Sequence, residues 1–106
     1  MPTAEETLRD FVTRFRRDAA GGVNLLYQLH LTGEGGGSWQ LQVADQKCEL
    51  AAGVAREPDV TITMAVEDWG ELLAGRLDPY GAFLQGRVMV SGNLEAAMKL
   101  QGLFAL

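Results

Sequence analysis

Two runs of alternating residues, separated by glycines, place the strongest constraint on how this chain can fold. The apolar positions are Leu25, Tyr27, Leu29 and Leu31 in the first run and Trp39, Leu41 and Val43 in the second. A period of two is typical of strands that bury one face. Residues 33–37, Gly-Glu-Gly-Gly-Gly, supply the positive backbone angles that a hairpin loop needs. The pattern therefore predicts an antiparallel hairpin.

Helical periodicity precedes the hairpin. Thr3 and Glu6 form a capping box, and an apolar stripe follows over residues 3–18. The stripe consists of Leu8, Phe11, Val12 and Phe15. A docked first helix is expected over this range, closed by residues 19–22.

Three strands and three helices are expected after the hairpin. A third strand spans residues 47–54, with Cys48, Leu50, Ala52 and Val54 on one face, and a fourth spans residues 59–64. Helices follow at residues 67–75 and from Asp78-Pro79, then a fifth strand around Val88 and Val90, and a last helix over residues 93–104. This order predicts an α+β domain in which helices cover one face of a five-stranded, mostly antiparallel sheet.

Length and charge narrow the classes of function. A chain of 106 residues fits one domain, residues 1–106, and its net charge of -5 opposes nucleic-acid binding. Cys48 is the only cysteine, which excludes an intrachain disulfide. No apolar run is long enough to span a membrane, and the first segment is too charged for a signal peptide. We expect a cytoplasmic protein of unspecified oligomeric state.

The sequence contains few of the residues that usually carry out catalysis. His30 is the only histidine, and the only serines are Ser38 and Ser91, with no motif that would join them in a triad. No cluster of His, Cys, Asp and Glu has the spacing of metal ligands. The sequence therefore predicts no enzymatic activity, no metal and no cofactor.

Gln101 is the unusual residue of the last helix. On a wheel of about 100 degrees per residue it lies in the middle of an apolar face with Leu94, Ala97 and Met98. A buried amide without a partner costs roughly 1 to 3 kcal/mol. Either the backbone satisfies Gln101 or a molecule bound in a cavity does, and the sequence leaves both alternatives open.

Three segments of the second half together resemble a known family. They are PDVTITM at residues 58–64, GRLDPYGAFLQGRVMVSGN at residues 75–93 and AAMKLQGLF at residues 96–104. In order and spacing they are similar to the sterol-carrier-protein type-2 lipid-binding domains, and residues 23–54 resemble that family more loosely. The resemblance implies a five-stranded sheet whose helices enclose an apolar tunnel for fatty acyl chains, acyl-CoA, sterols or phospholipids.

The resemblance also implies a set of ligand-binding residues. These are Trp69, Leu72, Leu73, Phe83, Leu84, Met98, Leu103 and Phe104, with Gln85 and Gln101 as interior glutamines. For each one, membership of the ordinary core is the competing interpretation, because apolar stripes at helical spacing usually form core.

Two interpretations of function follow. The first is non-enzymatic binding and intracellular transfer of a lipid, with transient contact to a membrane surface. Arg14, Arg16 and Arg17 provide either a weakly basic docking surface or a solvated helix end, while Met89 stands where the family often has a basic residue. The alternative is a scaffold or interaction module whose cavity is closed, for example by Leu103, Phe104 and Leu106.

Overall fold

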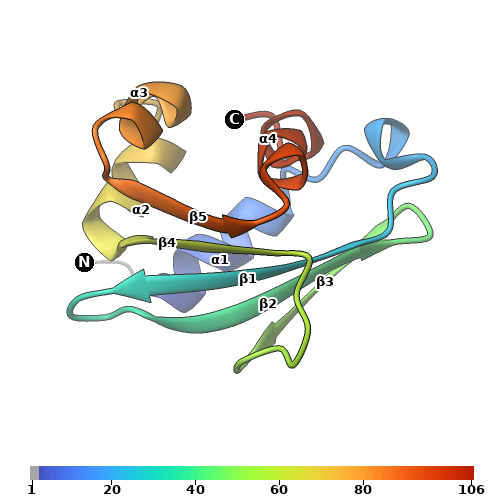
Figure 1. Ribbon diagram of the computed structural model, residues 1–106, viewed down its shortest axis with the longest axis horizontal. Helices are drawn as coiled ribbons and strands as arrows, with labels where there is room; N and C mark the ends of the chain where they lie inside the picture. Colours follow the sequence, from blue (N-terminus) through green and yellow to red (C-terminus); the bar gives the residue numbers. More distant parts are fainter. Residues whose placement is uncertain (1–2) are drawn as a thin grey trace.

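The computed structural model describes residues 3–106 and shows a five-stranded sheet with helices on one of its faces (Figure 1). The strands are β1 (Leu25–Thr32), β2 (Gly37–Ala44), β3 (Lys47–Ala52), β4 (Val60–Ala65) and β5 (Val88–Gly92). The helices are α1 (Ala4–Val12), the 3-10 turn η1 (Arg17–Ala20), α2 (Val66–Leu73), α3 (Pro79–Leu84) and α4 (Leu94–Leu103). The predicted α+β class and the mostly antiparallel sheet are confirmed.

The sheet is built around the predicted hairpin. β1 and β2 pair antiparallel with Leu29 opposite Trp39, and the strand order is β3-β2-β1-β4-β5. Within residues 3–106, the β1–β4 pair is the single parallel one, with Leu29 opposite Ile62. Tyr27, Leu29 and Leu31 are buried on the helix-covered face, as the alternation predicts.

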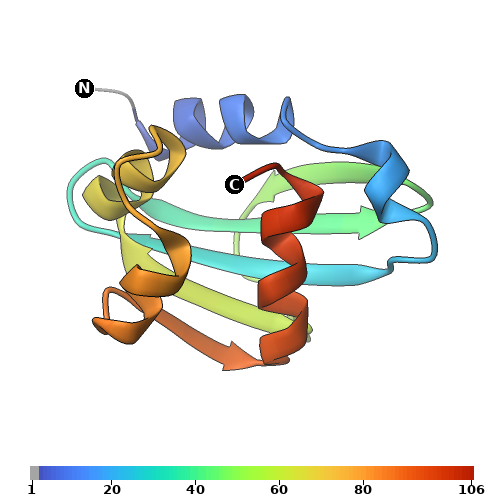
Figure 2. The ribbon, with the colours of Figure 1, turned by 90° about the horizontal axis from the view of Figure 1, so that it is seen from above.

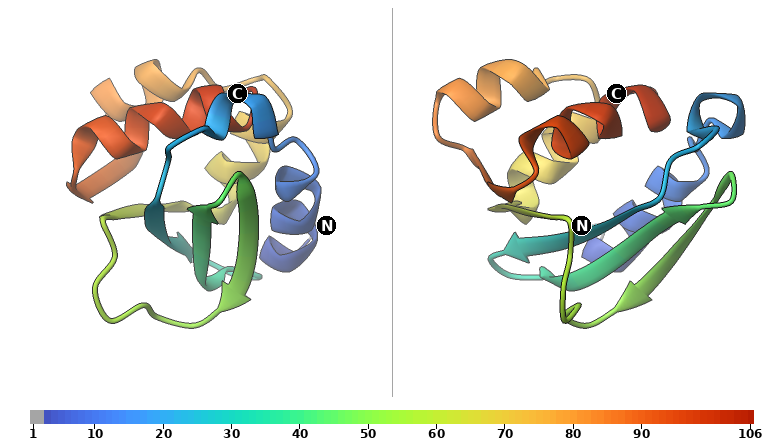
Figure 3. Two further views of the ribbon diagram at one scale, coloured as in Figure 1. Left: turned by 90° about the vertical axis from the view of Figure 1, so that its right-hand side faces the viewer. Right: turned by 45° about the vertical axis from the view of Figure 1, so that its right-hand side comes forward.

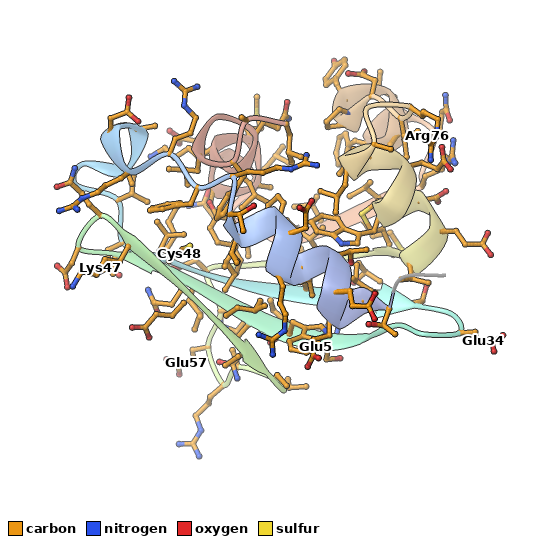
Figure 4. All side chains as sticks on the ribbon, turned by 180° about the vertical axis from the view of Figure 1, so that it is seen from behind. Glu5, Glu34, Lys47, Cys48, Glu57 and Arg76 are labelled. Carbon is orange, nitrogen blue, oxygen red and sulfur yellow. The ribbon has the colours of Figure 1, made fainter. Side chains whose placement is uncertain are left out.

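The connection between β3 and β4 crosses the opposite face of the sheet, where Figure 1 shows it below the strands. Gln28 is buried beneath it, with 1% of its surface exposed. Its Nε2 donates to the carbonyls of Trp39 and Gly53 at 3.0 and 3.1 Å, and its Oε1 accepts from the Ala55 amide at 2.6 Å. The side-chain amide of Gln28 therefore holds the connection between β3 and β4, which we name the crossover, against the sheet. Further along the crossover, Glu57 lies on the side of the molecule away from Arg76 (Figure 4).

Two predicted boundaries were wrong. The first helix ends at Val12 because the Thr13 hydroxyl bonds back to the Asp10 carbonyl and the chain then departs toward α4, where the Arg16 amide donates to the Leu103 carbonyl at 2.7 Å. The third strand ends at Ala52, because Gly53 turns the backbone with φ of 118°. Val54 is consequently 69% exposed in the crossover.

A cluster of aromatic rings ties the helices together. The Phe11 ring of α1 stacks on Phe104 at 4.2 Å between centroids and meets Trp69 of α2 edge-on at 4.9 Å. Phe15 adds a tilted contact to Phe104 at 5.4 Å. The Trp69 Nε1 donates to the Thr7 hydroxyl at 3.0 Å. The end of α4, the start of the chain and α2 are therefore held as one unit.

The buried amide of Gln28 gives a first prediction. Replacing Gln28 by Leu should lower the free energy of unfolding by about 1 to 3 kcal/mol, because two carbonyls and one amide lose their partner. Chemical denaturation measures this quantity. Gln40→Leu is the matched control, since Gln40 lies opposite Gln28 in the register and is half-buried without a hydrogen bond from its side chain within residues 3–106. Equal losses in both variants would contradict the assigned role.

The aromatic cluster gives a second prediction. Phe104→Ala should cost about 3 to 5 kcal/mol of unfolding free energy, since the ring is fully buried. Met98→Ala, on the same helix but 60% exposed, should cost less than about 1 kcal/mol. Thermal and denaturant unfolding of both variants would check this. A mild effect of Phe104→Ala would mean that the ring is not part of the core.

Candidate ligand cavity

An apolar cavity of about 160 Å³ lies between the sheet and helices α2, α3 and α4. Figure 2 shows these helices from above, with α4 running across the sheet and α3 beside β5. The strands supply Leu29, Leu31, Ile62, Met64, Val88 and Val90. The helices and the chain end supply Trp69, Leu72, Pro79, Tyr80, Phe83, Leu94, Ala97, Met98, Leu100, Gln101 and Leu106. The space is therefore bounded by four separate stretches of the chain.

Helix α4 forms one wall because it has two apolar faces. Ala96, Leu100 and Leu103 are buried, whereas Leu94 and Met98 line the cavity and are partly exposed. Asn93 caps the helix by accepting from the Ala96 amide at 3.1 Å. The predicted inward face with Leu94, Ala97, Met98 and Gln101 is the face that lines the cavity.

A buried hydrogen bond fixes the height of α4 above the sheet. The Tyr27 hydroxyl of β1 donates to the Ala96 carbonyl at 2.7 Å. Burial raises the pKa of Tyr27 from 10.0 to about 12, and the negative charge of Asp59 adds to this. The hydroxyl is therefore neutral near neutral pH and available as a donor.

Helix α3 forms the opposite wall and is loosely attached. Asp78 caps it through the Gly81 amide at 2.8 Å, and Ala82 is its only buried residue. Glycines with positive φ flank it at Gly75 and Gly86, with φ of 78° and 74°.

Two ion pairs hold the segments that flank α3 against α2. Arg76 bonds Glu71 through Nε at 2.6 Å, and Arg87 pairs with Asp68. The hydrogen bond from Arg76 lowers the pKa of the Glu71 carboxyl. The Arg76–Glu71 pair is solvent-exposed and contributes little to stability, whereas the Arg87–Asp68 pair is partly buried on the Asp68 side.

The chemistry of the cavity wall is almost entirely apolar. None of the lining residues within the described range carries a charge, and Gln101 supplies the only side-chain amide. Gln101 is half-buried, and no hydrogen bond joins its side chain to another residue of 3–106. The indole Nε1 of Trp69 is already occupied by Thr7. The wall can thus bury an apolar molecule and offer it one amide.

The structure brings half of the predicted ligand-binding residues together at the cavity. They are Trp69, Leu72, Phe83, Met98 and Gln101. The other five lie elsewhere. Leu103 and Phe104 are buried in the core, where Phe104 stacks on Phe11, and Leu73 is half-buried against that core.

Leu84 and Gln85 point to solvent because α3 turns its other side to the cavity. Leu84 is 66% exposed, and Gln85 is an exposed residue at the C-terminal cap of α3. The expectation that Gln85 is an interior glutamine is therefore corrected: the buried glutamine of this fold is Gln28, on the other face of the sheet.

The strand residues of the cavity floor were not predicted as site residues. The sequence did contain a signal for these residues, namely the alternation of apolar side chains in two adjacent strands. The inward positions are those of Leu29, Leu31, Ile62 and Met64. Alternation reveals which residues point inward, but not whether they meet a helix or an open space.

Two other features are absent from residues 3–106. No helix in this range is long and apolar enough to cross a membrane. No group of three or more His, Cys, Asp and Glu residues in it is placed to hold a metal ion.

Comparison with known proteins places this geometry in a family. The model of the SCP-2 sterol transfer family matches residues 8–105. Hydroxysteroid dehydrogenase-like protein 2 of Rattus norvegicus is 32% identical over 100 residues, which make up 93% of this chain and 19% of that protein. Sterol carrier protein 2 of Gallus gallus is 41% identical over 66 residues, 62% of this chain and 12% of that protein.

A solved structure agrees over the whole length. The solution structure of palmitated SCP2L2 from Aedes aegypti superposes with a TM-score of 0.75 at 26% identity, covering 99% of this chain and 96% of that chain. The chain spans about a fifth or less of the two curated relatives named above. Since the family model covers nearly all of its residues, the chain belongs to the SCP-2 sterol transfer family.

Proposed function

We propose that this domain binds a lipid in the cavity and carries it between sites without catalysing a reaction. The observation that carries the proposal is a cavity with uncharged walls and one free amide, Gln101. Burial of an acyl chain in such a space is favourable by roughly 0.8 kcal/mol for each methylene. The palmitated state of the Aedes aegypti relative supports an acyl chain as one class of ligand.

The size of the cavity implies that α3 moves when a lipid binds. A volume of about 160 Å³ is similar to that of an engineered apolar cavity, roughly 150 Å³, that holds benzene. Sites for larger ligands are on the order of 300 to 1,000 Å³. Helix α3 is the wall that can yield, because it buries only Ala82 and lies between two glycines. Outward movement of Tyr80 and Phe83 enlarges the space.

Gln101 is proposed to hold the polar group of the ligand. The amide can donate to a carbonyl or accept from a hydroxyl, and no other side chain in residues 3–106 competes for it. Trp69, Leu72, Phe83 and Met98 are proposed to contact the hydrocarbon part.

A closed scaffold is the competing function. It requires the C-terminal residues to fill the cavity. Leu103 and Phe104 are buried in the core, where Phe104 stacks on Phe11, and neither lines the cavity. Leu106 does line the cavity, but a space of about 160 Å³ remains beside it. This arrangement favours the lipid carrier.

Native mass spectrometry tests the proposed function. The purified protein is stripped of lipid and incubated with an equimolar mixture of a fatty acid, a fatty alcohol, a sterol and a phospholipid. We expect a one-to-one adduct whose mass identifies the preferred class, because the cavity has one compartment. Absence of any adduct from the fresh and the incubated protein would overturn the proposal in favour of the scaffold.

The role of Gln101 predicts a difference between two ligands of equal length. Gln101→Leu should weaken binding of a fatty alcohol about 3- to 10-fold, the value of one hydrogen bond, and leave binding of the matching alkane unchanged. Displacement of a fluorescent fatty acyl probe gives both affinities. Gln85→Leu makes the same substitution at an exposed site and should alter neither. Equal weakening of alcohol and alkane by Gln101→Leu would refute the headgroup role.

A further inference from the structure

Large apolar side chains are exposed mainly on two helices of this molecule, α3 and α4. Seven of them within residues 3–106 are well exposed: Val54, Tyr80, Phe83, Leu84, Met89, Leu94 and Met98. Five of the seven belong to α3 and α4, the helices on either side of the cavity. We name these five residues, Tyr80, Phe83, Leu84, Leu94 and Met98, the apolar rim. Contiguous exposed apolar surface marks a site of interaction.

The apolar rim is continuous with the interior of the cavity. Tyr80, Phe83, Leu94 and Met98 line the cavity and are also between 40% and 63% exposed. Leu84 extends the rim outward and is 66% exposed. Figures 1 and 3 show α3 and α4 on the same side of the sheet, so one flat surface can touch both helices. A molecule that leaves the cavity between these helices passes along this rim.

The charges around the apolar rim give it no basic character, and Asp78, the exposed N-cap residue of α3, adds one acid close to Tyr80. Helix α3 contains no charged residue, and α4 contains one acid, Glu95, and one base, Lys99. The flanking arginines, Arg76 and Arg87, are already paired with acids of α2. The rim therefore offers apolar contact without the excess of positive charge that would select an anionic surface.

We propose that the apolar rim docks on the surface of a zwitterionic phospholipid bilayer, so that a lipid passes between membrane and cavity without crossing water. This proposal rests on the proposed lipid-binding function. Aromatic and aliphatic side chains on a helix can enter the headgroup boundary by about 5 to 10 Å, and tyrosine is suited to that boundary. A stable protein interface needs about 20 to 30 residues a side, which five side chains around an opening do not supply.

The test compares two serine substitutions at equally exposed sites. Leu84→Ser changes the rim, and Val54→Ser changes the crossover on the other face, with exposures of 66% and 69%. Neither residue lines the cavity. Sedimentation with phosphatidylcholine vesicles should show about tenfold weaker binding for Leu84→Ser and wild-type binding for Val54→Ser. The rate of transfer of a fluorescent acyl lipid between vesicles should fall in the same ratio.

A second pair of variants and a salt series complete the test. Met98→Ser should weaken vesicle binding, and Met89→Ser, with 67% exposure on β5, should not. Raising NaCl from about 0.05 to 0.5 M should leave binding to phosphatidylcholine unchanged, because no charges drive it. Binding that requires anionic lipid and is lost in salt would overturn the proposal and assign docking to the arginines after α1.

Other outcomes separate this proposal from the proposed function. Equal loss in Leu84→Ser and Val54→Ser, or a wild-type dimer in sedimentation velocity that Leu84→Ser dissociates, would overturn docking on membranes. Lipid adducts without any vesicle binding would leave the carrier function in place and reject the docking surface. Rim-dependent vesicle binding by a protein that never acquires lipid would support docking and reject the carrier.

Discussion

The position of α4 is the constraint on which the rest of the structure depends. One end is fixed to β1 by the buried Tyr27–Ala96 hydrogen bond, and the other by the stacking of Phe104 on Phe11. With its ends held in this way, α4 lies over β4 and β5 but does not fill all the space between the helices and these strands. Strand residues that face the helices, Ile62 and Val90 among them, form the floor of the cavity.

The position of α4 also determines which polar groups bond within the protein and which can bond to a ligand in the cavity. The side chains of Gln28, Trp69 and Tyr27 each make hydrogen bonds to other groups of the protein. Gln101 alone among the amides faces the cavity without a partner. Because Gln101 is half-buried, solvent can reach its amide in the empty domain, and a ligand with a hydrogen-bonding group would replace that solvent.

Periodicity and caps predicted the elements of this fold well, because they depend on local sequence. The hairpin, the strand faces and the caps at Thr3, Asp78 and Asn93 all follow from neighbouring residues. Contacts between distant segments did not follow. Burial of Gln28 depends on a crossover 25 residues away, and the early end of α1 depends on Leu103. Gln85 and Gln101 both follow apolar residues in the sequence, so the sequence does not distinguish them. They differ in the structure because of how α3 and α4 are turned: Gln85 faces solvent, and Gln101 faces the cavity.

The distribution of charge fits a carrier that has to release its ligand. The net charge of -5 resides outside a cavity whose lining is uncharged, so the ligand that we propose would be held chiefly by its hydrocarbon part and one amide. Such contacts grow with chain length but discriminate weakly between headgroups. Helix α3, which we propose to move, buries one alanine and is flanked by one exposed and one partly buried ion pair, so its opening would disturb little of the core. In the proposed carrier, the rigid part of the domain shapes the site and the loosely attached part controls access to it.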